Sequence, residues 1–503
     1  MVLRTLMCTF LILAGPLAVP VLAELPEPTR TPLVRTVDLD VGEVRHVELC
    51  DGSPATVKLV ALRETRDAIR DAVRTATVTV EVNRERVELV AATYHLPTTI
   101  AGVRIDCAVT RGYTADSSKK NVWGLEKDAR LRLWPAGSPM IDPATFSYPV
   151  KLKWFSSDTQ MANVPCFVDG GEVPRRGRIY YHYGLDFGGA EGMVDVLAAT
   201  AGLVVSAAGK TLPGYEDTPV APRYDVVYVL DDRGWFYRYS HMQTIDKGIV
   251  PGKTIRRGQK IGVLGKEGGS GGWSHLHFDV KSRQPSGTWG TQAAYGFAWE
   301  AYQREYRPAI IAVARPHRLL WAGESATLDG SRSWSSAGGL QFEWTLSDDS
   351  KARGAKLTRR YDKPGSYSEI LKVTDSAGRV DFDFQVVQVI DRQRPEPLPP
   401  TIHAVYSPTF GIRPGDPVTF KVRTFRTSGG ETWDFGDGTP PVSVKSDGNA
   451  RVHAEDGYAV TTHCFEKPGR YLVRVEHTGA REAKATARLH VLVEAIWGLG
   501  AGD

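Results

Sequence analysis

Short runs in which apolar and polar residues alternate recur along much of the chain. Between residues 24 and 150 they include VRTVDLDV, ATVKLVAL, ATVTVEVN and RVELVAATYHL. A repeat of two residues, rich in β-branched side chains, is typical of strands that bury one face. We therefore predict a mainly β protein in which residues 24–150 form a β-rich N-terminal domain of unknown type. Within it, only ETRDAIRDAV (64–73) has a helical pattern.

Short apolar runs separated by glycine turns continue through residues 151–310, and they predict a domain built on antiparallel β-sheet. One segment differs. In TQAAYGFAWEAYQREY (291–306) the aromatic residues recur at helical spacing, and Arg307-Pro308 follows. We expect a helix there that packs its aromatic residues into the core and ends before the proline.

The last part of the chain contains a repeated β pattern. KPGSY and KPGRY recur about a hundred residues apart, and WDFGDGTP precedes the second copy. These segments resemble PKD-type repeats, which implies immunoglobulin-like β-sandwiches over 311–392 and 401–495. The proline-rich RQRPEPLPP (392–400) between them predicts a semi-rigid spacer. Asp434 and Asp437 of the WDFGDG segment are interpreted as turn residues rather than as calcium ligands.

The first 23 residues have the pattern of a signal peptide. Arg4 is their only charge, an apolar run follows, and Val21-Leu22-Ala23 resembles a cleavage site. Gly15 and two prolines interrupt the apolar run, which argues against a lasting membrane helix. We expect export to the periplasm, the cell surface or the extracellular space, with no membrane span after signal removal.

Composition limits the range of partners and of cysteine chemistry. The formal net charge is +4 with acids and bases interspersed, so no nucleic-acid footprint is present. Export leaves Cys50, Cys107, Cys166 and Cys464, none in CxxC spacing, which argues against a cysteine metal site. Three disulfide connectivities are open. We expect Cys50–Cys107, within one β-rich segment, to be a bridge that stabilises the fold by roughly 2–4 kcal/mol.

Candidate chemistry is concentrated in YYHYGLDFGG, YRYSHMQT and WSHLHFDV. These segments contain His182 and Asp186, then His241, then His275 and His277. Imidazole and carboxylate are ligand types that zinc prefers. Residues two apart on a strand point to one face, so the rings of His275 and His277 are expected to share one cleft. A catalytic zinc keeps three protein ligands and one position for water, so two of the five groups remain to move protons.

The same segments resemble the lysostaphin-like zinc endopeptidases of bacterial cell walls. HYGLD fits H-x-G-x-D, SHLHF fits H-x-H, and GIVPGKTIRRGQKIGVLGKEG (248–268) resembles the family's glycine-rich run. The resemblance covers roughly residues 175–282 and implies one Zn²⁺ per chain, with metal ligands listed as His182, Asp186 and His277. It implies His241 and His275 as catalytic residues, and hydrolysis of peptide bonds in peptidoglycan, in a cross-link or a stem.

Two departures from the family pattern lie beside the H-x-H pair. The preceding loop GGSGGWSHLH contains extra glycines and Trp273, and Asp279 stands where Glu is common. Neither changes a ligand, but the loop is expected to form a wall of the substrate groove. Substrate preference therefore stays open.

Two other functions remain open on the sequence. One is a non-catalytic wall-binding or hydrolase-activating protein on the same scaffold, although such members lose ligands or catalytic histidines and this chain keeps all five. The other is an extracellular protease that acts on Gly-rich protein. The PKD-type domains carry no candidate catalytic group, so we expect them to bind polymer or protein. A chain ending near Arg315 is then expected to cleave a soluble peptide at a near-normal rate.

Overall fold

A computed structural model gives the fold of most of the chain. The expected signal peptide 1–23 and Cys166 lie outside the part that it describes. The structure describes residues 25–91, 94–115, 117–119, 121–159, 179–395, 398–425, 427, 429–447, 457–478 and 484–495. Within these ranges the protein is mainly β, as predicted, with strands β1 to β35 and only two helices. Neither helix has the length and apolar character needed to cross a bilayer.

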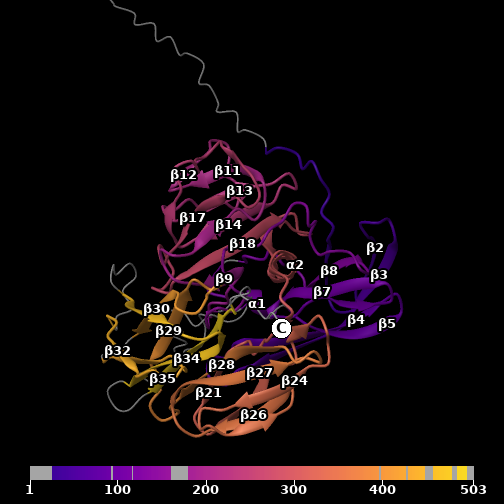
Figure 1. Cartoon of the computed structure of the whole chain (residues 1–503). Helices are drawn as coiled ribbons and strands as arrows, with labels where there is room; N and C mark the ends of the chain where they lie inside the picture. The colour runs from indigo at the N-terminus through magenta and orange to yellow at the C-terminus, as the bar shows by residue number, and fades with distance from the viewer. Residues whose placement is uncertain are drawn as a thin grey trace, which may run out of the picture.

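The N-terminal domain packs two antiparallel sheets around one core (Figure 1). The first sheet has the order β2 (Val44–Glu48), β3 (Pro54–Arg66), β4 (Val73–Val82), β5 (Glu85–Val90). The second has the order β1 (Arg35–Leu39), β8 (Ala129–Pro135), β7 (Val103–Thr110), β6 (Thr98–Ile100), and the short α1 (Gly112–Ala115) follows β7.

Two sequence predictions in this domain are wrong. The segment 64–73 is not a helix, because β3 and β4 extend into it and Asp67 caps the turn between them. Its Oδ1 accepts hydrogen bonds from the backbone N–H groups of Ile69 and Arg70. Cys50 and Cys107 are free thiols rather than a bridge. Cys50 follows β2 in one sheet, whereas Cys107 lies in β7 of the other sheet and is buried in the core, where burial raises its pKa.

The central region follows the N-terminal domain and is built on the sheet β12-β11-β13-β14-β18-β19. In addition, β9 pairs with the first half of β18, and β16 pairs with β11. A smaller sheet has the order β10-β17-β15. The bounds are β9 (Leu185–Gly188), β10 (Asp195–Leu197), β11 (Gly202–Ala207), β12 (Lys210–Thr211), β13 (Val227–Leu230), β14 (Phe236–Ser240), β15 (Met242–Ile245), β16 (Thr254–Ile255), β17 (Lys260–Leu264), β18 (His275–Arg283) and β19 (Trp289–Gln292).

The predicted helix is α2 (Tyr295–Tyr306), which buries its aromatic residues in the core of this region as expected. Trp299 meets Trp154 edge to face at 5.3 Å between ring centroids. The helix ends at Arg307, which adopts a left-handed conformation (φ 46°) directly before Pro308. A residue before proline is disfavoured in the helical region, so the sequence dictates this end.

Two β-sandwiches follow, each with its own core. The first contains β21 (Arg318–Trp321), β22 (Glu324–Asp329), β23 (Trp334–Ser335), β24 (Gln341–Thr345), β25 (Lys351–Arg353), β26 (Lys356–Tyr361), β27 (Gly365–Thr374) and β28 (Val380–Ile390), and β20 (Ile310–Ile311) pairs with β23. The second contains β29 (Thr401–Ser407), β30 (Pro417–Phe425), β31 (Glu431–Asp434), β32 (Val442–Val444), β33 (Ala459–Cys464), β34 (Gly469–Thr478) and β35 (Lys484–Val493).

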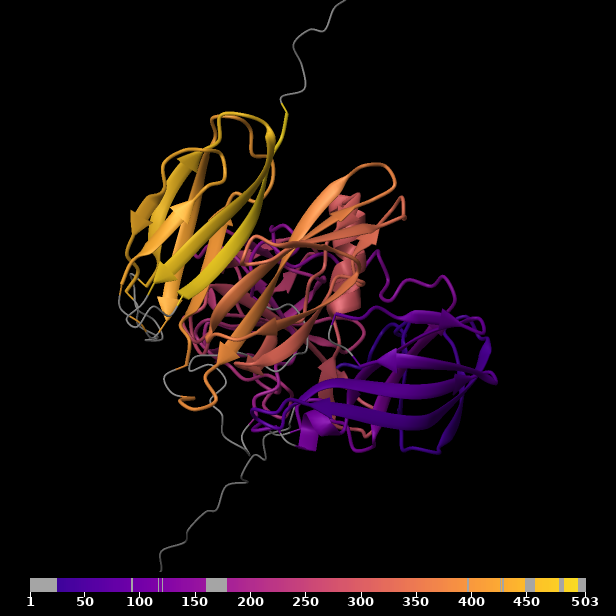
Figure 2. The same cartoon turned by 90° about the horizontal axis from the view of Figure 1, so that it is seen from below.

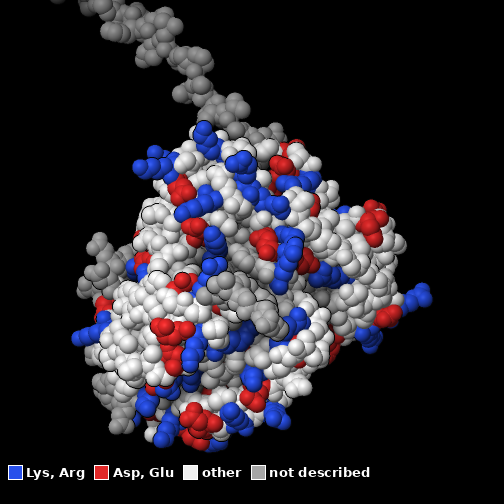
Figure 3. Space-filling model, viewed as in Figure 1, with Lys and Arg blue, Asp and Glu red and all other residues white. Residues whose placement is uncertain are grey.

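The two sandwiches contact each other directly, whereas the proline-rich segment 392–400 was predicted to be a semi-rigid spacer between them. β27 of the first pairs with β35 of the second, so one sheet continues through both. Both also lie against the central region, as the two views in Figures 1 and 2 show. Acidic and basic side chains are mixed over the face seen in Figure 3.

Candidate metal centre

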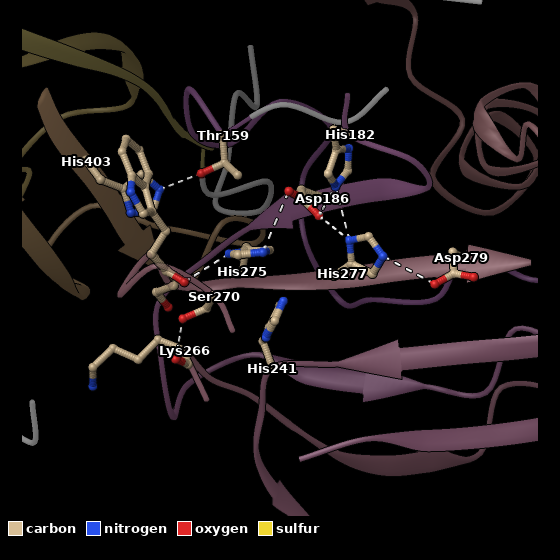
Figure 4. Close-up of polar contacts among 12 residues, drawn as sticks. Thr159, His182, Asp186, His241, Lys266, Ser270, His275, His277, Asp279 and His403 are labelled. Atoms are coloured by element: carbon tan, nitrogen blue, oxygen red, sulfur yellow. Dashed lines mark hydrogen bonds and ion pairs between the residues drawn. The ribbon is translucent and has the colours of Figure 1, made fainter. Parts of the chain in front are cut away.

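Three side-chain donor atoms converge where β9 meets β18. Asp186 lies directly opposite His277 in the antiparallel register, and His182 lies just before β9. The separations are 3.0 Å from His182 Nε2 to Asp186 Oδ1, 3.1 Å from His182 Nε2 to His277 Nδ1, and 2.9 Å from His277 Nδ1 to Asp186 Oδ1 (Figure 4). All three residues are buried. The structure therefore places the three predicted ligands in one triangle.

Gly184 makes this approach possible. It has φ 86°, a conformation that side chains rarely adopt, and a Cβ there would lie 2.7 Å from the carbonyl oxygen of Phe278. It would also lie 3.3 Å from His277 Cε1. The glycine between His182 and Asp186 thus lets the chain turn closely against β18.

The N-terminal domain holds the segment before His182. The hydroxyl of Tyr181 accepts a hydrogen bond from the backbone N–H of Val73 in β4 at 2.8 Å, and its ring meets Tyr113 edge to face. Tyr181 also belongs to the core of that domain. The N-terminal domain therefore contributes to the placement of the first candidate ligand.

Asp279 orients His277. His277 Nε2 lies 3.2 Å from Asp279 Oδ2, and the carboxylate is in turn 3.3 Å from Arg238. A proton on Nε2 is donated to this carboxylate, which leaves the lone pair of Nδ1 directed at His182 and Asp186. Asp279, a departure from the family pattern, thus holds its neighbouring candidate ligand in the tautomer that binds metal.

The donor set fits a zinc ion. Ligand atoms bound tetrahedrally at ordinary zinc distances lie about 3.3 Å from one another, close to the separations found here. Without a cation, lone pairs of His277, His182 and the carboxylate would face each other at these distances. Burial alone raises the pKa of Asp186, but His182 and His275 outweigh it and hold that pKa well below its ordinary value. The aspartate is therefore an anionic ligand.

His241 and His275 lie beside the triangle, with ring centroids 4.7 Å apart. Nδ1 of His275 is 2.9 Å from the carbonyl oxygen of Trp273, and Nδ1 of His241 is 2.6 Å from that of Glu267. A carbonyl only accepts, so each Nδ1 carries the proton and each Nε2 is left as a lone-pair acceptor. His275 Nε2 lies 3.7 Å from Asp186 Oδ2. Burial lowers the pKa of His275, and it lowers that of His241 to about 3, so both rings are neutral bases.

Asp225 and Arg223 support His241, a feature that the sequence reading missed. His241 has φ 65°, a strained value for a non-glycine residue, and its backbone N–H donates to Asp225 Oδ2 at 3.0 Å. Arg223 binds both carboxylate oxygens of Asp225, at 2.5 and 2.6 Å. Burial raises the pKa of Asp225, but the contacts with His241 and Arg223 hold it below the ordinary value. No spacing rule links these residues in the sequence, although Arg223-x-Asp225 is a compact charged pair.

All five predicted residues line one cavity. Its other walls come from the two C-terminal sandwiches, which the sequence did not predict. They contribute His317, Arg318 and Gln388 from the first, and Thr401, Ile402 and Thr486 from the second. The candidate site therefore lies between domains rather than on an open face.

Comparisons with known proteins agree with this arrangement. Residues 180–287 match the model of peptidase family M23, and residues 307–389 and 402–493 match PKD domain models. The chain thus contains an M23 peptidase domain followed by two PKD domains, as predicted.

Individual relatives are more distant. Collagenase ColA of Clostridium perfringens (strain 13 / Type A) is 32% identical over 81 residues, which is 16% of this chain and 7% of that protein. Among solved structures, Helicobacter pylori Csd3 is 17% identical over 49% of this chain and 82% of its own, with a TM-score of 0.19. The fibronectin(III)-like modules of Clostridium thermocellum CbhA are 12% identical over 39% of this chain and 100% of theirs, with a TM-score of 0.16.

Proposed function

We propose that this protein is an exported, zinc-dependent endopeptidase that hydrolyses peptide bonds of peptidoglycan. One observation carries the proposal: a triangle of three donor atoms lines the same cavity as two neutral imidazoles that donate from Nδ1 to backbone carbonyls. The match of residues 180–287 to peptidase family M23 supports the peptidase chemistry.

His182 Nε2, Asp186 Oδ1 and His277 Nδ1 are the atoms proposed to hold one zinc ion. When bound, zinc lowers the pKa of its water and polarises the scissile carbonyl. Asp279 keeps His277 in the required tautomer through Nε2. The ligand set is complete with three residues, which leaves a position for water.

His241 and His275 are proposed to move the protons. Each ring is neutral, and Nε2 of either accepts a proton from the attacking water. The protonated ring then donates its Nε2 proton to the leaving amine as the peptide C–N bond breaks. Both rings donate from Nδ1 to a backbone carbonyl, so these hydrogen bonds do not assign either role to one ring, and we propose that the two histidines share them.

Asp225 and Arg223 are proposed as positioning residues for His241. The carboxylate holds the strained backbone of His241 through its N–H, and Arg223 fixes the carboxylate. The ring of His241 thereby keeps its place beside His275 before substrate binds, so less of the binding energy is needed to order it.

The substrate is proposed from the family resemblance: a cross-link or stem peptide of peptidoglycan. A second candidate is a Gly-rich extracellular protein, which the 81-residue similarity to collagenase ColA favours. In either case the PKD domains are proposed to bind polymer or protein. A non-catalytic, wall-binding role is disfavoured because all five residues of the site are kept.

Digestion of purified peptidoglycan and of elastin, followed by mass spectrometry, tests the proposal. We expect new amine and carboxyl termini in the peptide part of peptidoglycan, and none with His275→Ala, which keeps the three ligands. Cleavage of elastin alone would favour the second candidate. Binding of peptidoglycan by zinc-loaded protein that also fails to cleave a soluble peptide released from it would favour the non-catalytic one.

A further inference from the structure

The second PKD domain contacts the loop that leads into His275. Trp273 stacks on Phe425 with ring centroids 4.9 Å apart and an angle of 8°. Arg423 donates from Nη1 to the carbonyl oxygen of Gly272 at 2.9 Å, and the backbone N–H of Ser274 donates to the hydroxyl of Tyr458 at 2.9 Å. Three successive residues before a proposed catalytic histidine are thus held by another domain.

The segment 157–159, which also lines the cavity, is held in the same way. Thr159 Oγ1 lies 2.7 Å from Nε2 of His403, and His317 Nε2 donates to the carbonyl oxygen of Asp158 at 2.7 Å. Arg315 donates to the carbonyl oxygen of Thr159 at 2.8 Å and to that of Ser157. Figure 4 shows Thr159 and His403 beside the five residues of the candidate site. Both PKD domains therefore bind the segment 157–159.

The contacting residues belong to the outward face of the second PKD sandwich. Along β29 and β30, Ile402, Ala404 and Val422 point into the sandwich core, whereas His403 and Arg423 lie opposite each other on the other face. His403 and Arg423 are fully buried here. Thr159 and Gly272 of the peptidase domain cover this face together with Asp447 and Tyr458 of the same sandwich.

The cavity between the domains is small. Its volume is about 110 Å³. Sites that bind a drug-sized ligand usually have about 300–1,000 Å³. A peptide that extends on both sides of a cleaved bond needs at least such a volume, so the cavity lined by the described residues is too small for a polymer strand.

We infer that the two PKD domains act as a built-in lid that holds the metal cleft closed against polymeric substrate. The inference rests on the proposed function. Because β27 and β35 join the two sandwiches, the lid moves as one body about the segment after α2. In the closed form the full chain has low activity, and release of the contacts on Gly272, Trp273 and Ser274 opens the cleft.

Two variants of the zinc-loaded full chain test the lid. Phe425→Ala removes the stack on Trp273. Tyr458→Phe removes only the hydroxyl that binds Ser274. The second variant keeps the test valid if Phe425→Ala fails to fold. Tyr471→Ala is the matched control, because this partly buried ring packs inside the same sandwich. The first readout is the rate at which the chelator 4-(2-pyridylazo)resorcinol extracts zinc. The second is cleavage of a soluble peptide released from peptidoglycan.

If the lid exists, zinc extraction is at least tenfold faster for Phe425→Ala and severalfold faster for Tyr458→Phe, and it stays within twofold of wild type for Tyr471→Ala. Peptide cleavage should increase most for Phe425→Ala, less for Tyr458→Phe and least for Tyr471→Ala. Unchanged extraction rates in both test variants would overturn it. Faster extraction with slower cleavage would also overturn it, because the PKD domains would then be a required wall of the substrate site. If no variant cleaves peptide, the proposed function fails, while the extraction rates still decide the lid.

Discussion

At the scale of single residues, two kinds of imidazole surround the cavity. His182 and His277 face Asp186 with a lone pair, and their separations suit one cation. His241 and His275 instead donate from Nδ1 to backbone carbonyls, which leaves Nε2 of each ring as a lone-pair acceptor. The proposed division between metal binding and proton transfer rests on these hydrogen bonds.

The first prediction separates the two kinds. His182→Ala or Asp186→Ala removes one of three ligands, so elemental analysis should find most of the zinc lost. His275→Ala should keep about one zinc per chain while peptide cleavage falls by roughly 10²–10⁴-fold, the usual contribution of proton transfer. Zinc retained in full by His182→Ala and Asp186→Ala would contradict the ligand assignment. Zinc lost from His275→Ala would contradict its role as a proton carrier.

The second prediction concerns Asp225. Asp225→Ala frees the strained backbone of His241, and we expect kcat to fall by roughly 10–10²-fold with KM and zinc content near wild type. Asp225→Asn keeps an oxygen for the His241 N–H and should recover part of the loss. The matched control is Asp195→Ala, which removes a half-exposed ion pair with Lys260 in the same domain. An equal loss in the control, or an unchanged kcat in Asp225→Ala, would argue against positioning.

At the scale of elements, the metal centre depends on a turn and a register. The turn before β9 places His182 over Asp186, and the pairing of β9 with β18 places Asp186 opposite His277. Spacing predicts that His275 and His277 share a face, whereas the meeting of Asp186 with His277 was implied only by the family resemblance. Asp225 could not be predicted in this way, because it acts through a backbone N–H from another segment.

The third prediction tests the glycine of the turn. Gly184→Ala and Gly258→Ala both place a side chain at positive φ (86° and 75°), but a Cβ at Gly258 meets nothing within 4 Å. Gly258→Ala should therefore lower the free energy of unfolding by only about 1–2 kcal/mol, the cost of the left-handed conformation. Gly184→Ala adds a clash with β18, so we expect a larger loss in urea unfolding and weaker zinc binding. Equal losses in both variants, with normal zinc affinity, would show that the close approach is unimportant.

At the scale of the whole molecule, the main difference from expectation is the placement of the PKD domains. The resemblance to PKD-type repeats implied two β-sandwiches, and composition predicted a semi-rigid proline-rich segment between them; both sandwiches are present. Their packing over the cleft depends on pairs such as Trp273 and Phe425, which lie far apart in the sequence and have no spacing pattern. Arg315, near which an active truncated chain was expected to end, is itself fully buried in this junction. Truncation there removes contacts of the peptidase domain.

The junction should also be sensitive to acid. Burial lowers the pKa of His403 and of His317 to about 3, and that of His490 to about 4. Between these values and about 6.5, the unfolded chain binds protons that the folded chain does not, so stability falls as pH decreases through this range. Each such histidine contributes a slope of about 1.4 kcal/mol per pH unit. Above about pH 6.5 the contribution is constant.

The fourth prediction follows for His403. His403→Gln should reduce the pH dependence of urea unfolding between pH 6 and pH 4 by about 1.4 kcal/mol per unit. Asp158, whose pKa burial raises to about 7, acts in the opposite direction over this range, so the difference between variant and wild type is the quantity to measure. His46→Gln, at an exposed position in the N-terminal domain, is the control. A slope that is the same in wild type and His403→Gln would contradict the buried neutral histidine.

A zinc titration of activity tests the central claim most directly. Chelator-stripped Phe425→Ala, in which the cleft is expected to be open, is titrated with zinc while new amino termini are counted in purified peptidoglycan. We predict that hydrolysis is absent without metal, rises with added zinc and saturates at one zinc per chain, and that His275→Ala stays inactive throughout. Hydrolysis that is independent of zinc, or its absence at every zinc concentration, would contradict the account.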